Sequence, residues 1–330
     1  MRKYLHHVLI ILSILLLLAT IGIIGLQIYG NKLIENAGRF EEWDDTNGTV
    51  VTNLSYGPKT LHNYDLYLPT TPPKALMLFI HGGSWMSGNK EEGEWFCRRY
   101  AKMGYATATM NYSLLSPHDP SACMPRMLKE ITSCINHIKS ELKSRGYEVL
   151  QMAIAGYSAG AHLALLYANK EKAHTPLPIR FCINIVGPTD LRYIFKVDQS
   201  TLDSIYTETA AGHTHPKKES LDALAFYAAE HTLNPATPCT AEYLDSLLCV
   251  SSPLCYISAT STPCIMAYGA NDVLVSKEHH EQLLEAYKTH NIDHQFILYP
   301  NSDHLLANDT LQTRMLHEAI VNFATKYFEK

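Results

Sequence analysis

Several common signatures of cofactor and nucleic-acid binding are missing from this sequence of 330 residues. No Cys-x-x-Cys pair occurs among the eight cysteines, which argues against a zinc knuckle or a thioredoxin-type site. The net charge of −5 comes without a long basic run, so nucleic acid is not an expected partner. The 17 histidines are scattered, and the pair His213 and His215 lies in a polar loop without a cysteine or carboxylate at ligand spacing, so we predict no metal site.

The cysteines leave the redox compartment open. Cys182 and Cys264 lie in apolar, strand-like runs and are predicted to be buried free thiols. The other six form two groups in which disulfides are possible but cannot be paired from the sequence: Cys97, Cys123 and Cys134, and Cys239, Cys249 and Cys255.

Charged side chains are also missing from residues 8–28. At about 1.5 Å per residue, a helix of this length spans roughly 31 Å, close to the thickness of a bilayer core. We therefore favour an uncleaved membrane anchor over residues 1–30; the alternatives are a cleaved signal that leaves a secreted protein, and a soluble core helix. Arg2 and Lys3 precede the run, which predicts a cytoplasmic N-terminus and an extracytoplasmic main domain. The polar residues 31–45 are expected to form a linker.

From residue 46 to residue 330, strand-like and helical segments alternate, which predicts a mostly parallel central sheet flanked by helices. Residues 49–56 and 62–68 alternate polar and apolar side chains and are expected to pair as an antiparallel hairpin, with one strand at the sheet edge. Residues 75–80 form a continuous apolar run, typical of a strand buried on both faces. Residues 191–257 are irregular and too long for a simple connection, so we predict a lid inserted between core strands.

The candidate nucleophile is a serine between a strand and a helix. Residues 156–160 read Gly-Tyr-Ser-Ala-Gly and match Gly-x-Ser-x-Gly, the nucleophile elbow. A short apolar segment precedes this motif and an apolar helical pattern follows it. The tight turn exposes the Ser158 hydroxyl, and the flanking glycines avoid collisions with neighbouring strands. The amides at the start of the following helix point at the same spot, where an oxyanion could be held.

A second main-chain site is predicted after the apolar run at residues 75–80, where residues 81–85 read His-Gly-Gly-Ser-Trp. Adjacent glycines allow backbone amides to approach a substrate closely, and a second oxyanion donor is needed at this position. An ordinary glycine turn is the alternative. We expect His81 to brace the loop, and Trp85 and Tyr157 to contact the substrate.

A serine hydroxyl needs a base to take its proton, and the base needs an orienting acceptor. Two later strands are followed by suitable residues, Asp272 and His304. The order Ser158, Asp272, His304 is the Ser–acid–His order of a hydrolase triad. One ring nitrogen of His304 would bind Asp272, and the other would meet the Ser158 hydroxyl.

Three further residues compete for these roles. Asp190 also ends a strand and is an alternative acid, although a structural or pocket-edge role is preferred. Asp303 is the neighbour of His304 and is expected to be a loop or capping residue. His162 lies one turn into the elbow helix and is expected to point into packing rather than to act as the base.

These motifs resemble the α/β-hydrolase superfamily. They are closest to the His-Gly-Gly-x-Trp esterases related to hormone-sensitive lipase, kynurenine formamidase and bacterial acetylxylan and feruloyl esterases. The resemblance covers roughly residues 44–330. It implies a catalytic triad of Ser158, Asp272 and His304, and an oxyanion hole built from the main-chain amides of Gly82, Gly83, Ser84 and Ala159.

The resemblance implies a serine carboxylester hydrolase that acts through an acyl-enzyme on short-chain or carbohydrate-linked esters, without metal or organic cofactor. An acyltransferase, an amidase or peptidase, and a non-catalytic binding domain are the alternatives. Two departures from the family pattern stand out. Ser84 replaces a third glycine and narrows the acyl side. Residues 111–114 read Asn-Tyr-Ser-Leu where many relatives carry Asp-Tyr-Arg-Leu, which puts a salt bridge of the family in doubt.

Overall fold

The computed structural model describes residues 41–329, except residues 117, 118, 120, 212, 214, 216 and 235–238. The expected membrane anchor, residues 1–30, and most of the expected linker lie outside this part of the chain. Among the described residues, no helix is both long and apolar enough to cross a bilayer.

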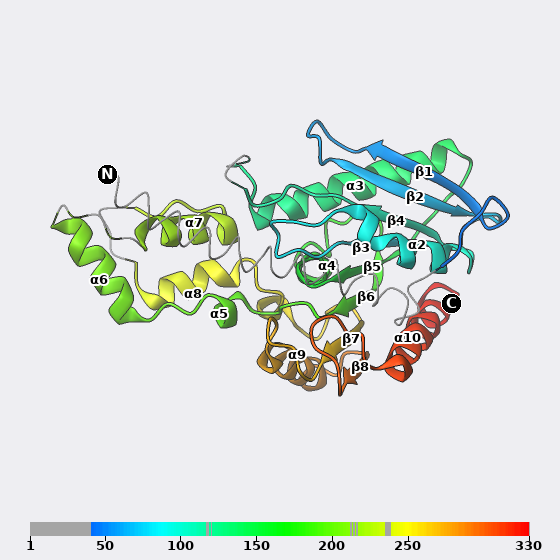
Figure 1. Cartoon of the computed structure of the whole chain (residues 1–330). Helices are drawn as coiled ribbons and strands as arrows, with labels where there is room; N and C mark the ends of the chain where they lie inside the picture. Colours follow the sequence, from blue (N-terminus) through cyan, green and yellow to red (C-terminus); the bar gives the residue numbers. More distant parts are fainter. Residues whose placement is uncertain are drawn as a thin grey trace.

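An eight-stranded sheet forms the centre of the molecule, in the order β1-β2-β4-β3-β5-β6-β7-β8 (Figure 1). Strand β2 pairs with β1 on one side and with β4 on the other, both in antiparallel fashion, and all other pairs are parallel. The mostly parallel sheet and the antiparallel hairpin at its edge are thus confirmed. The strands are β1 (Gly48–Ser55), β2 (Asn63–Pro69), β3 (Leu76–Ile80), β4 (Ala106–Met110), β5 (Met152–Tyr157), β6 (Ile179–Ile185), β7 (Cys264–Gly269) and β8 (His294–Tyr299).

Helices cover both faces of the sheet. One face packs against α3 (Met124–Ser144), α4 (Ala159–Lys170) and α9 (Lys277–Thr289). The other face packs against α2 (Glu94–Ala101), which the short 3-10 helix η1 (Lys90–Gly93) precedes, and against α10 (Thr310–Phe328). Every residue of β3 is buried, because alternate side chains of a strand point to opposite faces and both faces are covered.

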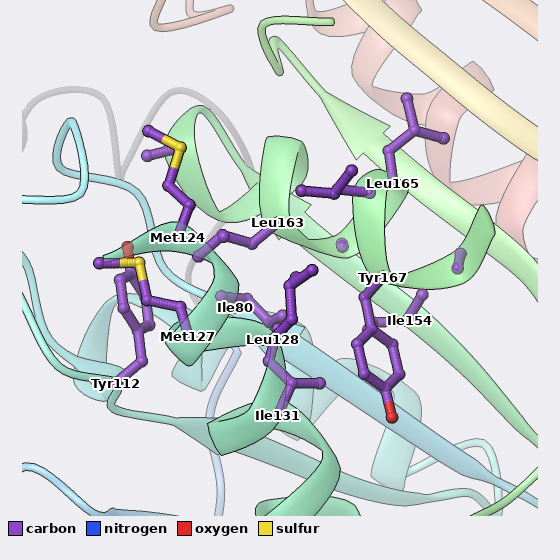
Figure 2. Close-up of a cluster of buried hydrophobic side chains, with 14 of the residues drawn as sticks. Ile80, Tyr112, Met124, Met127, Leu128, Ile131, Ile154, Leu163, Leu165 and Tyr167 are labelled. Carbon is purple, nitrogen blue, oxygen red and sulfur yellow. The ribbon is translucent and has the colours of Figure 1, made fainter. Parts of the chain in front are cut away.

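The helix that follows Ser158 is fixed by apolar packing. Figure 2 shows Leu163 and Leu165 of α4 with Leu128 and Ile131 of α3 and Ile80 of β3 in one cluster. All five side chains are at most 2% exposed. Their burial removes apolar surface from water and holds the start of α4 against the carboxyl end of the sheet.

The insertion between β6 and β7, which the sequence predicted to be irregular, is largely helical. It contains α5 (Leu191–Ile194), α6 (Gln199–Ala210), α7 (Lys218–Ala229) and α8 (Ala241–Cys249), followed by the 3-10 helix η2 (Pro253–Tyr256). Figure 1 shows α6, α7 and α8 projecting from one end of the sheet. A disulfide joins Cys249 to Cys255, and the other six cysteines are free and buried.

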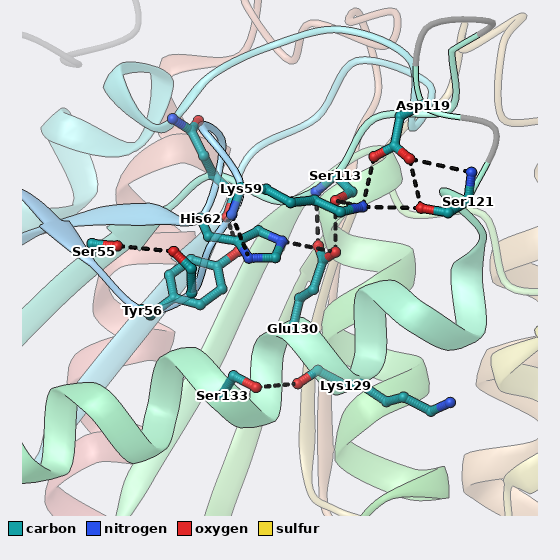
Figure 3. A network of polar contacts seen from close by, with 12 residues as sticks. Ser55, Tyr56, Lys59, His62, Ser113, Asp119, Ser121, Lys129, Glu130 and Ser133 are labelled. Carbon is teal, nitrogen blue, oxygen red and sulfur yellow. Dashed lines mark hydrogen bonds and ion pairs between the residues drawn. The ribbon is translucent and has the colours of Figure 1, made fainter.

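A buried polar network occupies the position where the sequence departs from the family pattern (Figure 3). Glu130 of α3 accepts hydrogen bonds from the Ser113 amide at 2.7 Å and from the Ser113 hydroxyl at 2.6 Å. It also binds Nε2 of His62 at 3.1 Å, while Lys59 binds Asp119 at 2.6 Å. The serine of the Asn-Tyr-Ser-Leu run therefore reaches a carboxylate on α3 through its hydroxyl and its amide.

Candidate active site

Ser158 occupies the turn between β5 and α4 with the backbone of a nucleophile elbow. Its φ of 52° lies in the left-handed region, which a side chain disfavours. The Ser158 amide donates to the Ile185 carbonyl at 2.8 Å, which fixes the turn to the end of β6. The hydroxyl is therefore presented at the carboxyl edge of the sheet.

The glycines of the motif are required by close approaches. A Cβ atom on Gly156 would lie 2.3 Å from the carbonyl carbon of Gly160. A Cβ atom on Gly160 would lie 2.1 Å from the carbonyl oxygen of Ile80 in β3. Helix α4 can start this close to β3 only because both positions lack a side chain.

The structure brings together the three residues expected to form the triad. Nε2 of His304 lies 2.9 Å from the Ser158 hydroxyl oxygen, and Nδ1 of His304 lies 2.7 Å from Oδ2 of Asp272. The Asp272 side chain is 1% exposed and that of His304 is 11% exposed. The other carboxylate oxygen of Asp272 accepts from the amides of Leu274 and Val275, both at 2.9 Å. Because a carboxylate only accepts, Nδ1 of His304 carries the proton and Nε2 is free to accept one.

The loop that carries His304 is held by contacts that the sequence did not indicate. Asp309 accepts hydrogen bonds from the Ser302 hydroxyl at 2.6 Å and from the Asn301 amide at 3.0 Å. The Tyr157 hydroxyl donates to the His304 carbonyl, and the two rings meet edge to face at 5.7 Å. Tyr157 thus contacts His304 itself; its contact with substrate stays a prediction.

Three peptide groups in the loop and in the elbow have carbonyl oxygens that accept hydrogen bonds within the protein. The carbonyl of Gly82 accepts from Nδ1 of His81 at 2.8 Å, that of Gly83 from the Met86 amide at 2.9 Å, and that of Ser158 from the His162 amide at 3.0 Å. In a trans peptide the C=O and the next N–H point in opposite directions. The N–H groups of the following residues therefore point away from these three hydrogen bonds. They belong to Gly83, Ser84 and Ala159.

Gly82 allows this loop to approach Ser158 closely. A Cβ atom on Gly82 would lie 3.3 Å from Cβ of Ser158 and 3.1 Å from the Tyr157 carbonyl oxygen. A larger residue at position 82 would push the loop and the elbow apart. The loop therefore approaches the Ser158 side chain closely at Gly82.

Trp85, expected to form a pocket wall, is 7% exposed and faces the interior. Its indole nitrogen donates to Nδ1 of His162 at 3.2 Å. A direct contact of Trp85 with substrate remains a prediction, and the side chain already has a partner within the protein.

The competing residues have other partners. Burial opposes ionisation of Asp190, but hydrogen bonds from Arg192 outweigh it and hold the pKa of this carboxyl below its usual value. Asp303 accepts from the Leu305 amide at 2.9 Å, as a loop residue would.

The ring of His81 stacks on Tyr112, with ring centroids 4.4 Å apart, and braces the loop. Within the described part of the chain, no group of three His, Cys, Asp or Glu residues could hold a metal ion.

The sheet order, the elbow after β5 and the helical insertion after β6 define an α/β-hydrolase fold. Comparison of the sequence with known families agrees. The chain belongs to the BD-FAE family, an esterase family, and the match covers residues 64–287. Ser158 and Asp272 lie inside the matched range, whereas His304 lies beyond it.

The three relatives described next are each less than 30% identical to this chain over the matched residues. A probable isoprenylcysteine alpha-carbonyl methylesterase of Oryza sativa subsp. japonica is 29% identical over 117 residues, which are 35% of this chain and 27% of the relative. The kynurenine formamidase of Drosophila melanogaster is 25% identical over 196 residues, 58% of this chain and 62% of the relative. A probable carboxylic ester hydrolase of Mycobacterium tuberculosis is 26% identical over 233 residues, 68% of this chain and 48% of the relative. The chain spans less than two thirds of the length of each.

Two solved structures share the fold. A truncated carbohydrate esterase from gut microbiota superposes with a TM-score of 0.65 at 19% identity, covering 88% of this chain and all of the other. An inhibited esterase B from Lactobacillus rhamnosis superposes with a TM-score of 0.62 at 16% identity, covering 92% of this chain and 96% of the other. At these identities the likeness shows a common fold.

Proposed function

We propose that this protein is a serine carboxylester hydrolase that acts through an acyl-enzyme. The observation that supports this most strongly is the continuous set of hydrogen bonds from Asp272 through His304 to Ser158, at 2.7 and 2.9 Å. The three side chains come from loops that follow three different strands of one sheet edge. Membership of an esterase family is consistent with this reading.

The proposed reaction has two steps. Nε2 of His304 takes the Ser158 proton while the hydroxyl oxygen attacks the ester carbonyl carbon, and Asp272 stabilises the imidazolium that forms. Main-chain amides hold the negative oxygen of the tetrahedral intermediate, and one such donor lowers the barrier by about 3–4 kcal/mol. The donors are those of Gly82, Gly83, Ser84 and Ala159.

The imidazolium then donates its proton to the leaving alcohol as the ester C–O bond breaks. A water molecule gives a proton to the same nitrogen and attacks the acyl-enzyme, and the carboxylic acid leaves as Ser158 regains its proton. No metal or organic cofactor takes part in the proposed cycle.

We propose short-chain or carbohydrate-linked esters as substrates. Ser84 carries a side chain at a position where a third glycine would leave more space for an acyl group. Esters of graded acyl length, together with acetylated xylan, test this directly. Turnover that peaks at acetate or butyrate supports the proposal, whereas a preference for long acyl chains would contradict it.

A formamidase or other amidase is the second candidate, because the similarity to Drosophila kynurenine formamidase covers 58% of this chain. The same triad can attack an amide carbonyl. Parallel assays with an aryl ester and the matching aryl formamide separate the two activities. An acyltransferase would pass the acyl group to an added alcohol, and a non-catalytic binding domain would turn over neither substrate.

We further propose that the insertion, about residues 191–257, acts as a lid that shapes the substrate pocket. Its base meets the catalytic region at two points. The carbonyl of Ser251 binds the His162 ring at 2.7 Å, and the hydroxyl of Ser252 lies 3.4 Å from the Asp190 carboxylate. Loss of chain-length discrimination on shortening α6 and α7 would support this role.

We also propose a single-pass membrane protein with residues 1–30 as anchor, residues 31–45 as linker and residues 46–330 as an extracytoplasmic hydrolase domain. The uncharged run at residues 8–28 supports an anchor. The Cys249–Cys255 disulfide supports an oxidising compartment. Protease digestion of intact cells should remove the hydrolase domain, and full protection of the domain would contradict this orientation.

The activity itself is tested by Ser158→Ala with a short p-nitrophenyl ester as substrate. We expect hydrolysis to disappear while the thermal unfolding midpoint stays close to that of the wild type. Retained turnover in the purified variant would refute the assignment of the nucleophile.

A further inference from the structure

The oxyanion loop, residues 81–85, contains two residues in a backbone conformation that is unfavourable for residues with side chains. Ser84 and Trp85 have φ values of 53° and 61°, in the left-handed region that favours glycine. Two successive residues with side chains stay there only when surrounding contacts hold them. The contacts that hold this loop therefore decide where its amide donors point.

Trp85 has two such contacts. Its carbonyl accepts from the Leu115 amide at 2.8 Å, and its indole nitrogen donates to Nδ1 of His162 at 3.2 Å. The indole and imidazole rings meet edge to face, with centroids 5.0 Å apart. His162 is fully buried, so no water competes for its ring nitrogen.

The partner of the second ring nitrogen shows which nitrogen of His162 carries the proton. Nε2 lies 2.7 Å from the carbonyl oxygen of Ser251. Because that oxygen only accepts, Nε2 carries the proton, and Nδ1 of the neutral ring must accept from Trp85. Burial keeps the ring neutral by lowering the pKa of His162 to about 4.

Ser251 is itself held in place. It lies between Cys249 and Cys255, the two ends of the disulfide-closed segment at the base of the insertion. Its hydroxyl donates to the Ala228 carbonyl of α7, and the neighbouring Ser252 hydroxyl accepts from the Leu191 amide at 2.9 Å. The acceptor for His162 thus belongs to a segment tied to both α7 and α5.

We propose that His162 is a positioning residue that holds the oxyanion loop through Trp85, with Ser251 of the disulfide-closed segment fixing the tautomer that this contact requires. This inference rests on the proposed esterase function. It gives the insertion a role in the chemical step, since the insertion supplies the outer end of the chain Ser251–His162–Trp85. It also gives Trp85 a role inside the protein, beside the predicted contact with substrate.

Packing alone would also account for a buried histidine with two hydrogen bonds, and kinetics separates the two roles. A misaligned oxyanion hole weakens only transition-state binding, so kcat falls while KM stays. A purely structural role affects the unfolding midpoint and the fraction of folded enzyme, but not kcat per active site. Active sites are counted by titration with a fluorophosphonate.

The test uses His162→Leu, which removes both ring nitrogens, and His162→Gln, which keeps one donor and one acceptor. For His162→Leu we expect kcat per titrated site on a short p-nitrophenyl ester to fall about 10- to 100-fold, with KM within about 2-fold. His162→Gln should recover most of that loss. His280→Gln is the control, since this buried histidine stacks on Phe296 and makes no contact with the loop. Unchanged kcat in His162→Leu would overturn the proposal.

Trp85→Phe tests the same contact from its other end if His162→Leu does not fold. It should lower kcat to a similar extent, and the double variant with His162→Gln should be no worse than Trp85→Phe alone, because both changes act on one hydrogen bond. Unchanged kcat in Trp85→Phe, or losses that multiply, would contradict the proposal. Failure of the esterase function itself gives a different result, namely wild-type protein with no Ser158-dependent turnover or titration.

Discussion

Nε2 of His304 lies 2.9 Å from the hydroxyl oxygen of Ser158, although 146 positions separate the two residues in the chain. The distance is that of a hydrogen bond ready for proton transfer. Asp272 continues the contact on the other side of the imidazole. The predictions below test whether this arrangement does the chemistry and what holds it in place.

Asp272→Asn should reduce kcat by about 10³- to 10⁴-fold with little change in the fold. The amide group can donate to Nδ1 of His304 and thereby favours the tautomer that protonates Nε2, which cannot then accept from Ser158. Asp303→Asn is the matched control, since Asp303 lies beside His304 and its carboxylate accepts only a local amide hydrogen bond. It should keep kcat within about 2-fold, and equal losses in the two variants would argue against Asp272 as the triad acid.

Gly160→Ala should destabilise the protein by several kcal/mol and displace the elbow. The new methyl group would lie 2.1 Å from the Ile80 carbonyl oxygen and 2.3 Å from that of His81, and backbone cannot yield cheaply. Gly146→Ala is the comparison, because a Cβ atom there meets nothing within 4 Å but the φ of 85° is unfavourable. We expect about 1 kcal/mol for that variant in urea unfolding. Similar losses in both would show that steric contact is not the cause.

The free energy of unfolding should fall as pH decreases from about 6.5 to about 4. Burial lowers the pKa of His81, His162 and His279 to about 4 each. Between these pH values the unfolded histidines bind protons and the folded ones do not, so acid favours the unfolded state. Each contributes on the order of 3 kcal/mol across the window.

Urea unfolding at a series of pH values measures this slope. His162→Gln should reduce this slope by the contribution of roughly one proton, because one of the three imidazoles named above is gone. A free energy of unfolding that stays constant between pH 6.5 and pH 4.5 would contradict the neutral, buried state of these rings.

Replacing Cys249 and Cys255 together by serine should lower the free energy of unfolding by about 2 kcal/mol, the value expected for a short closed loop. A reducing agent should do the same to the wild type and nothing further to the variant. Cys239→Ser is the control for loss of a buried thiol in the same region, since Cys239 is free. Sensitivity of the double variant to the reducing agent would show that another disulfide is present.

The core elements and the candidate triad were accessible from the sequence because their signals are local. Apolar runs such as residues 75–80 predict strands. A candidate catalytic residue directly after a strand can then be placed, because the carboxyl ends of parallel strands lie at one edge of the sheet. Glycines at 156 and 160 mark a close approach that no other residue permits. The order Ser158, Asp272, His304 then favours Asp272 over Asp190 as the acid.

The insertion and the supporting contacts were not accessible. Helices α5 to α8 are 4 to 12 residues long, and tertiary contacts rather than local periodicity determine them. The pairing of Cys249 with Cys255 depends on how α8 meets η2. The bonds of His162 to Trp85 and Ser251 span 77 and 89 positions, and no local pattern announces them. The sequence therefore did not indicate that the Trp85 side chain has a partner within the protein.

The central claim is tested most directly by labelling the purified protein with a fluorophosphonate and locating the adduct by peptide mass spectrometry. We predict one adduct per chain, on Ser158, with labelling lost in Ser158→Ala and strongly slowed in His304→Ala. An adduct on another serine, or ester hydrolysis by wild-type enzyme that the reagent neither labels nor inhibits, would contradict a Ser158–His304–Asp272 mechanism.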